Sequence, residues 1–270
     1  MANEINFRNL MRDEKQKVKP KKVFDHDTTR LQPLQHPSSL LRRPMATPWP
    51  DDWATLPTLD TVKHCLSSQT PKYVYYQPNV LTASQQVDLL AWLHKLPIAI
   101  TPGQSASWNT MTYAKRRVAM FDSPLPGPLA VIASSLVTAG VFELTPNHVL
   151  VNEYLPGQGI LPHTDGPLYL PKTSTISIGG THVLLKLAKR LTADQIGIQE
   201  NKVALEVMLE GTGSLVTFCD EAYTNYVHSI DDQVTEEQAS DCCRNAKTGT
   251  IITRGYRISL TFRFKRQNVC

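Results

Sequence analysis

The sequence contains no run of 18 or more apolar residues, so no transmembrane helix and no membrane partner are expected. Its N-terminus lacks the apolar segment that forms the centre of a secretory signal. Cysteine is scarce: there are five residues, an odd number, and none shows C-x-x-C spacing. A cysteine zinc site is therefore disfavoured, and a reducing compartment is indicated. We expect the protein in the nucleus and cytoplasm.

Positive charge is concentrated at the N-terminus. Residues 1–50 carry ten Lys or Arg and five Asp or Glu, whereas the rest of the chain carries eighteen and nineteen. Aromatic residues are few in this segment, which predicts a largely disordered basic arm over 1–50. Its KVKPKK segment is either a nuclear address or phosphate-contacting group, or merely a solubilising tail. A Pro-rich linker over 51–71 and one folded domain over 72–266 are expected to follow.

Hydrophobic periodicity divides the domain into helices followed by strands. Residues 82–96 carry an apolar stripe at helical spacing behind an N-cap at Thr82 or Ser84, and 127–142 form a second apolar helix. From Asn147 onward, short segments alternate in polarity and are separated by Gly-rich turns, as strands are. Two helices before a run of strands predict an α+β fold, a sandwich or barrel packed by helices.

Polar residues two positions apart mark the segment NEYLPGQGILPHTDG. Because alternate residues of an extended chain point the same way, Asn152 and Tyr154 share a face, and so do His163 and Asp165. A His and a carboxylate at that spacing can bind one metal ion and leave half of its coordination sphere open. A second His, for which His228 is the candidate, would give the two-His-one-carboxylate set of non-haem Fe(II) oxygenases. The H-x-D pair alone is a weak signal, since it often occurs by chance.

Two arginines lie six positions apart on the last predicted strand. This even spacing places Arg257 and Arg263 on one face, with Cα atoms ~20 Å apart at ~3.3 Å per residue. A dicarboxylate lying between them, with one end on a metal, would satisfy both, because a planar guanidinium grips a carboxylate with two hydrogen bonds. The alternative is a surface strand whose wet face carries these two arginines together with Ser259 and Thr261.

In this order the N-x-Y, H-x-D, later His and R-x(5)-R motifs resemble the AlkB family of Fe(II)/2-oxoglutarate dioxygenases. The segments HVLVNEYLPGQGILPHTDGPLYLP and RGYRISLTFR are most similar to its eukaryotic alkB homologue 6 branch. The resemblance covers roughly residues 72–266 and implies a double-stranded β-helix (jelly-roll) core flanked by N-terminal helices.

The resemblance also implies a cofactor and its ligands. Fe(2+) would be held by His163, Asp165 and His228, with 2-oxoglutarate and O2 as co-substrates. Arg257 would bind the distal carboxylate, and Arg263 would lie at the metal end. The full set of implied co-substrate contacts is Asn152, Tyr154, Thr175, Arg257, Ser259 and Arg263. His148 and His182 lack metal-ligand spacing, and we interpret both as structural.

The reaction implied by the resemblance is oxidative demethylation of alkylated nucleic acid, RNA or DNA. 2-Oxoglutarate is decarboxylated to succinate while a C–H bond is hydroxylated, and a hydroxylated N-methyl group leaves as formaldehyde. The base must lie outside the stack, so a single-stranded or flipped base is expected. The family's recognition lid corresponds to SASWNTMTYAKRRVAMFD, where aromatics interleave with cations. The substrate residues we assign are Trp108, Tyr113, Lys115, Arg116 and Arg117, with Tyr169 at the pocket mouth.

Other interpretations stay open. The upstream segment could be an ordinary basic hairpin. The protein could be a demethylase or hydroxylase of a protein substrate, because AlkB relatives vary in substrate and the folded part is not basic overall. It could also be a weakly active nucleic-acid-binding protein. Two inserts, 188–202 and 231–250, depart from the family pattern without removing a ligand, and we expect the second to be a mobile polar loop.

Overall fold

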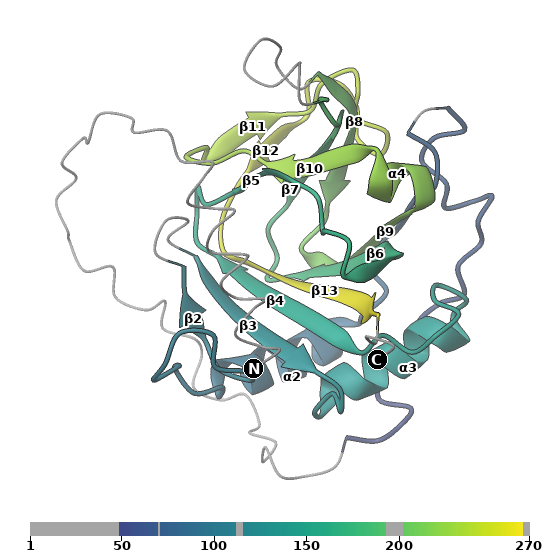
Figure 1. Cartoon of the computed structure of the whole chain (residues 1–270). Helices are drawn as coiled ribbons and strands as arrows, with labels where there is room; N and C mark the ends of the chain where they lie inside the picture. The colour runs from purple at the N-terminus through teal and green to yellow at the C-terminus, as the bar shows by residue number, and fades with distance from the viewer. Residues whose placement is uncertain (1–48, 70, 112–115, 193–201, 267–270) are drawn as a thin grey trace, which may run out of the picture.

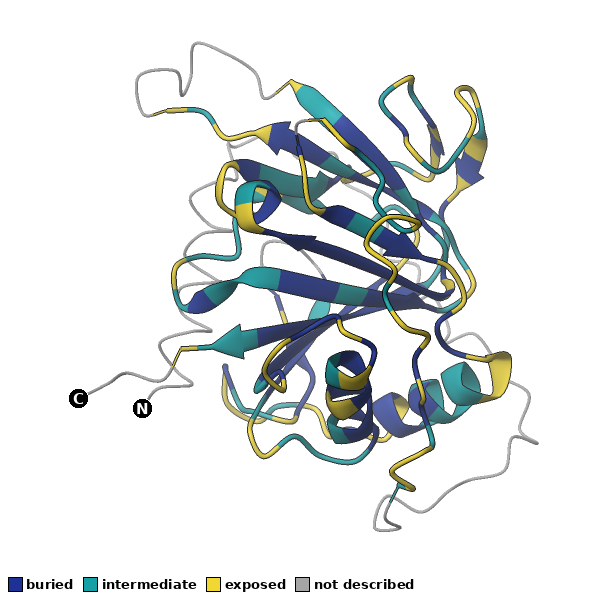
Figure 2. Ribbon diagram, turned by 90° about the vertical axis from the view of Figure 1, so that its right-hand side faces the viewer, coloured by how far each residue is buried: buried dark blue, intermediate teal, exposed yellow. Residues whose placement is uncertain are grey.

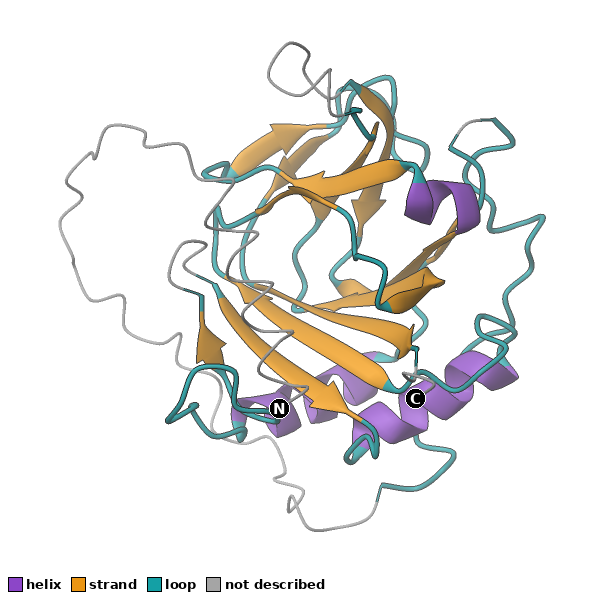
Figure 3. Cartoon of the chain, in the orientation of Figure 1, coloured by secondary structure: helices purple, strands orange, loops and turns teal. Residues whose placement is uncertain are grey.

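The computed structural model describes residues 49–69, 71–111, 116–192 and 202–266. Two antiparallel sheets face each other, and two helices lie along the outer side of the larger sheet (Figure 1, Figure 3). The predicted α+β jelly-roll core with N-terminal helices is therefore confirmed. Within the described ranges, no helix is long and apolar enough to span a membrane. The predicted arm, apart from its last two residues, and the centre of the 188–202 insert lie outside those ranges.

The two sheets have the crossed strand order of a jelly roll. The larger sheet runs β1 (Val74–Gln77), β9 (Thr212–Cys219), β6 (Tyr169–Ile178), β13 (Arg257–Lys265), β4 (His148–Tyr154), β3 (Arg117–Asp122) and β2 (Asn109–Thr110). The smaller sheet runs β5 (Ile160–His163), β10 (Tyr226–Ile230), β7 (Val183–Lys189) and β8 (Val203–Leu209). Strands far apart in sequence are thus neighbours, and the site residues of β4, β6 and β13 lie side by side.

Alternation along the central strands separates an apolar outer face from a polar inner face. On β13, Ile258, Leu260 and Phe262 join the core under the helices, whereas Arg257 and Arg263 line an interior cavity. The strands of the larger sheet are mostly buried, whereas those of the smaller sheet mix buried and intermediate residues (Figure 2). A buried polar face is unusual for a sandwich, where both inner faces normally form the core. It marks the space between the sheets as a binding site.

Both predicted helices are present and pack on the larger sheet. Helix α2 (Ala83–His94) begins at a capping box, in which the Thr82 hydroxyl accepts from the Gln85 amide and the Gln85 side chain accepts from the Thr82 amide. Helix α3 (Pro128–Thr138) starts with proline in its first turn, where the missing N–H costs nothing. The ring of Trp92, on α2, packs against that of Phe121, on β3, with centroids 5.8 Å apart.

Part of the predicted linker packs against the domain. Ala54 and Leu56 are buried in the same core as the two helices. The Gln77 side chain donates to the carbonyls of Pro57 and Thr58, so polar contacts also hold this segment. Proline here shapes an extended segment draped over the domain.

The 231–250 segment differs from the expected mobile loop. It contains β11 (Glu236–Gln238), which pairs with β12 (Ile251–Thr253) in a two-stranded sheet. Ala239 and Cys243 are buried against Leu184 of the smaller sheet. The polar sequence hides this packing because only a few small apolar side chains provide it. Earlier in the chain, the short helix α4 (Asp220–Thr224) links β9 to β10.

Candidate active site

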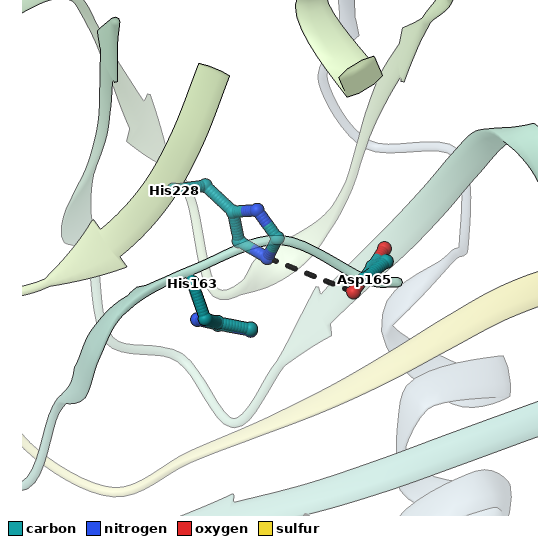
Figure 4. Close-up of side chains that lie close together, drawn as sticks. All are labelled: His163, Asp165 and His228. Carbon is teal, nitrogen blue, oxygen red and sulfur yellow. Dashed lines mark ion pairs between the residues drawn. The ribbon is translucent and has the colours of Figure 1, made fainter. Parts of the chain in front are cut away.

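Three side chains that the sequence places far apart meet at one end of the cavity between the sheets. His163 ends β5, and His228 is its direct partner on β10. Their ring centroids lie 4.2 Å apart, and one ligand atom from each of His163, Asp165 and His228 lies within 4.8 Å of the other two (Figure 4). His163 Nδ1 lies 2.8 Å from the Leu161 carbonyl, which can only accept. The proton is therefore on Nδ1, and Nε2 is the nitrogen suited to a metal.

Asp165 has one paired oxygen and one unpaired oxygen. Its Oδ1 accepts from Arg263 Nη2 at 2.5 Å, whereas its buried Oδ2 has no hydrogen-bond partner among the residues that the structure describes. Burial alone would raise the pKa of this carboxyl, but the charges of Arg263, His228 and His163 outweigh it and hold the pKa at about 2. A buried, ionised oxygen without a partner beside two imidazoles fits a cation. Two His and one carboxylate are the donor set of non-haem iron, so these residues fit Fe(2+).

Arg257 lies at the other end of the same wall. It is 4% exposed, donates from Nη1 to Ser177 Oγ at 3.2 Å, and lies 4.7 Å from the Tyr154 ring centroid. No carboxylate among the described residues forms an ion pair with it, and burial lowers its pKa. A buried guanidinium is costly without an anion, so this end of the cavity fits a carboxylate ligand.

The two ends belong to one cavity of about 400 Å³. Asn152, Tyr154, Ser259 and Thr261 line its wall between the two arginines. The surface-strand alternative for β13 is therefore wrong: all four polar residues of its inner face are buried. The cavity can accept an elongated dianion with one end near the metal ligands and the other at Arg257.

Two threonines of β6 face the cavity, and their hydrogen bonding differs. The Thr175 hydroxyl lies 3.1 Å from that of Thr261, so it already has a partner. The Thr173 hydroxyl is buried and has no partner in the described part of the chain. Thr173 also pairs directly with Arg263 across the sheet. Sequence reasoning chose Thr175 and missed Thr173, although the same two-residue alternation along β6 would have identified it.

Two of the predicted substrate residues lie on the outer, helix-covered side of the sheet. Trp108 is 2% exposed and donates from Nε1 to the Leu93 carbonyl at 3.0 Å, so its assignment to base stacking is wrong. Arg117 is paired through two hydrogen bonds with Glu153 and lies 5.0 Å from the Trp108 ring. Its assignment to phosphate contact in the recognition lid is contradicted too, because β3 turns this residue away from the site and Glu153 already pairs its guanidinium. Tyr113 and Lys115 lie outside the described residues.

Arg116 and Tyr169 both line the cavity. Arg116 is 1% exposed and donates from Nε to Asn152 Oδ1 at 3.2 Å, so it belongs to the co-substrate wall and not, as we predicted, to a surface that contacts phosphates. Tyr169 is buried, with its ring 5.3 Å from that of His148 and 5.1 Å from the Arg263 guanidinium. Its place at the pocket mouth stays a prediction.

The two histidines that we interpreted as structural take different positions. Neither belongs to the metal-ligand group found among the described residues. His182 lies beside a second, very small cavity behind Arg257. His148 is 2% exposed, lines the main cavity, and contacts Asp122 through Nδ1. It is buried and paired, as a structural residue would be, but it also faces the site.

Comparison with known proteins assigns the chain to a family. No protein-family model matches it. The chain is 30% identical over 207 residues to the zebrafish (Danio rerio) "Probable RNA/DNA demethylase ALKBH6", covering 72% of this chain and 86% of the relative. Through this relative, the chain is assigned to the Fe(II)- and 2-oxoglutarate-dependent oxygenases. The chain belongs to the AlkB family of dioxygenases, which makes it an oxidoreductase.

Solved structures with similar folds have low sequence identity. OsALKBH1 matches with a TM-score of 0.46 at 16% identity, over 70% of this chain and 97% of that protein. A Pseudomonas putida prolyl-4-hydroxylase matches with a TM-score of 0.45 at 14% identity, over 77% of this chain and all of that one. Because both scores are below 0.5, the family assignment depends on the zebrafish relative.

Proposed function

We propose that this protein is an oxidative demethylase of alkylated nucleic acid, RNA or DNA, with Fe(2+) bound by His163, Asp165 and His228. One observation carries the proposal: a single cavity has, as far as the described residues go, an unpaired carboxylate oxygen beside two imidazoles at one end and a buried guanidinium without a carboxylate at the other. The first end suits a divalent metal, and the second suits the distal carboxylate of 2-oxoglutarate.

The residues of the cavity have distinct roles in this proposal. Arg257 grips the distal carboxylate, with Tyr154 and Ser259 beside it. Arg263 holds Asp165 in place, and the Nδ1–H of His163 fixes that ring through the Leu161 carbonyl. The bound metal supplies the oxidation of a substrate C–H bond by O2, coupled to 2-oxoglutarate decarboxylation. The protein supplies orientation and a buried, water-poor site.

The choice of nucleic acid as substrate has support from the relative's described activity. The ligand group lies inside the cavity, so a methylated base would have to leave the stack to reach it, which favours single-stranded or flipped substrates. The basic arm, 1–50, is proposed to contact phosphates and to direct the protein to the nucleus as well as the cytoplasm. Comparison of tagged protein with and without KVKPKK in cells would test that localisation.

A protein substrate is the second candidate. The balance of charge outside the arm is slightly negative, with eighteen Lys or Arg against nineteen Asp or Glu, which does not favour a polyanion. Discrimination requires both substrate classes in one assay. Fe(II)-loaded protein is incubated with 2-oxoglutarate and a panel of methylated oligonucleotides and methylated peptides, and the products are identified by mass spectrometry.

The expected result is loss of 14 Da from one or more oligonucleotides, equal to one methyl replaced by hydrogen, with formaldehyde and succinate formed together. The His228→Ala variant is the matched control. It should leave the mass of every oligonucleotide unchanged and form no succinate. Demethylation of peptides alone would replace the nucleic-acid proposal with the protein one. Substrate binding without succinate formation would indicate the weakly active binding protein.

A further inference from the structure

His148 and Asp122 form a buried pair in the wall of the cavity, and no step above uses them. They are direct partners in the β3–β4 ladder, and His148 Nδ1 lies 3.1 Å from Asp122 Oδ1. The same carboxylate oxygen accepts from Lys265 Nζ at 3.1 Å. The imidazole is 2% exposed and lines the cavity. A buried histidine held by a carboxylate has a fixed orientation and tautomer.

The tautomer follows from the charges. Asp122 has a lowered pKa, chiefly because of its hydrogen bond with His148, so it is ionised and can only accept. Burial lowers the pKa of His148, so the ring is neutral. The proton is therefore on Nδ1, and Nε2 carries a lone pair. Within the described part of the chain, this second nitrogen makes no hydrogen bond, and the ring faces the cavity.

The acceptor lies next to the metal end of the cavity. His148 is the direct partner of Arg263 in the β4–β13 ladder, and Arg263 donates to Asp165. Directly opposed side chains in a sheet have Cβ atoms ~5 Å apart. The His148 ring also packs against Tyr169, with centroids 5.3 Å apart. A substrate group brought to the metal would therefore meet the His148 acceptor beside the Arg263 guanidinium in the cavity wall.

We propose that His148, held by Asp122, is a specificity-determining residue whose Nε2 accepts a hydrogen bond from an N–H next to the methylated nitrogen of the substrate. Ring-methylated adenine and cytosine provide this donor, because an exocyclic amino group neighbours the methylated nitrogen. N3-methyluracil does not, because its methylated nitrogen lies between two carbonyl groups. This inference rests on the proposed nucleic-acid demethylase function.

If His148 had only a structural role, its replacement would have a different effect on substrate preference. A histidine that only supports β3 and β4 would affect all substrates by the same factor when replaced. A histidine that contacts the substrate changes the ratio between substrates, because a buried acceptor left unpaired is penalised with one substrate and satisfied with the other. The ratio of kcat/KM values is therefore the informative quantity.

The experiment uses the full chain loaded with Fe(II), and single-stranded oligonucleotides that carry N1-methyladenine, N3-methylcytosine or N3-methyluracil. Formaldehyde release gives kcat/KM for each. The wild-type protein should prefer the first two by tenfold or more. His148→Met, apolar and of similar length, should reduce the preference towards one by slowing the first two. His148→Gln, which returns an oxygen acceptor close to the position of Nε2, should recover most of it.

The outcomes separate this inference from the function beneath it. Equal wild-type activity on all three oligonucleotides, or an equal loss on all three in His148→Met, would overturn the specificity role while the demethylase function stands. Decarboxylation of 2-oxoglutarate with no demethylation of any oligonucleotide would overturn the proposed function, and this inference with it. Where His148→Met fails to fold, Asp122→Asn is the second variant: its side-chain amide can donate to His148 Nδ1 and so place the ring proton on Nε2, which should lower the same preference.

Discussion

Arg263 donates from Nη2 to Asp165 Oδ1 across 2.5 Å, while Arg257, six residues earlier on the same face of β13, donates to Ser177 Oγ at 3.2 Å. One arginine therefore belongs to the metal end of the cavity and the other to the distal end. Their positions are fixed by the two-residue repeat of the strand. This division of roles gives the two arginines separable effects.

Arg257→Lys should weaken 2-oxoglutarate binding by tenfold or more, equivalent to ~1.4 kcal/mol, since lysine keeps the charge but loses the two-pronged contact. Metal binding should be unchanged, because the ligand group is at the other end of the cavity. Calorimetric titration of the Mn(II)-loaded protein, in which Mn(II) replaces oxygen-sensitive Fe(II), measures both. An unaltered 2-oxoglutarate titration would place the distal carboxylate elsewhere.

Arg263→Lys should act differently and serves as the matched comparison. Its replacement removes a donor from Asp165, so metal affinity and turnover should fall together with co-substrate affinity. A variant with weakened 2-oxoglutarate binding but wild-type metal affinity would contradict this role. The comparison uses the same titration of metal first and co-substrate second.

Thr173→Val and Thr175→Val should have different effects on the stability of the metal-free protein. The Thr175 hydroxyl pairs with Thr261, so its loss leaves a partner unsatisfied and should cost about 1 kcal/mol. The Thr173 hydroxyl has no partner within the described ranges, so its removal should be neutral or stabilising. Urea unfolding of both variants gives the two free energies. A larger cost at Thr173 than at Thr175 would contradict the assignment of these bonds.

We expect ionised Asp165 to stabilise the metal-free protein, and we expect this contribution to be lost at acid pH. Its folded pKa of about 2 lies below the ordinary value of 3.8, so the ionised form stabilises the fold. That contribution is fully present above the unfolded pKa and is lost as the pH falls from about 4 towards 2. It amounts to roughly 2 kcal/mol, since one pKa unit corresponds to ~1.4 kcal/mol. Asp165→Asn should lack this component in urea unfolding measured between pH 5 and pH 3, and equal pH dependence in both proteins would contradict it.

The sequence predicted the chemistry better than it predicted the substrate wall. H-x-D spacing and the even spacing on β13 depend only on the two-residue period of a strand, which is a local property. Trp108 and Arg117 were placed wrongly because the face that a strand turns to the cavity depends on its partner. Arg116 and Arg117 differ by one position, and β4 beside them decides which one faces inward.

The position of His148 at the cavity could not be predicted from the sequence for a related reason. Its sequence context shows no metal-ligand spacing, and that conclusion holds among the described residues. The contact with Asp122 joins two strands that are 26 residues apart in the chain, and no local pattern predicts it. The role proposed for this residue depends on that non-local pair.

The most direct test of the account is metal binding by single-ligand variants. His163→Ala, Asp165→Ala and His228→Ala should each abolish tight Fe(II) binding and 2-oxoglutarate turnover, because a site with three protein ligands has none to spare, while circular dichroism shows the domain still folded. Glu143→Gln, which removes a carboxylate from an ion pair with Lys172 outside the cavity, is a control that should keep both activities. Wild-type metal affinity and succinate formation in any one of the three alanine variants would contradict the assignment of this metal centre.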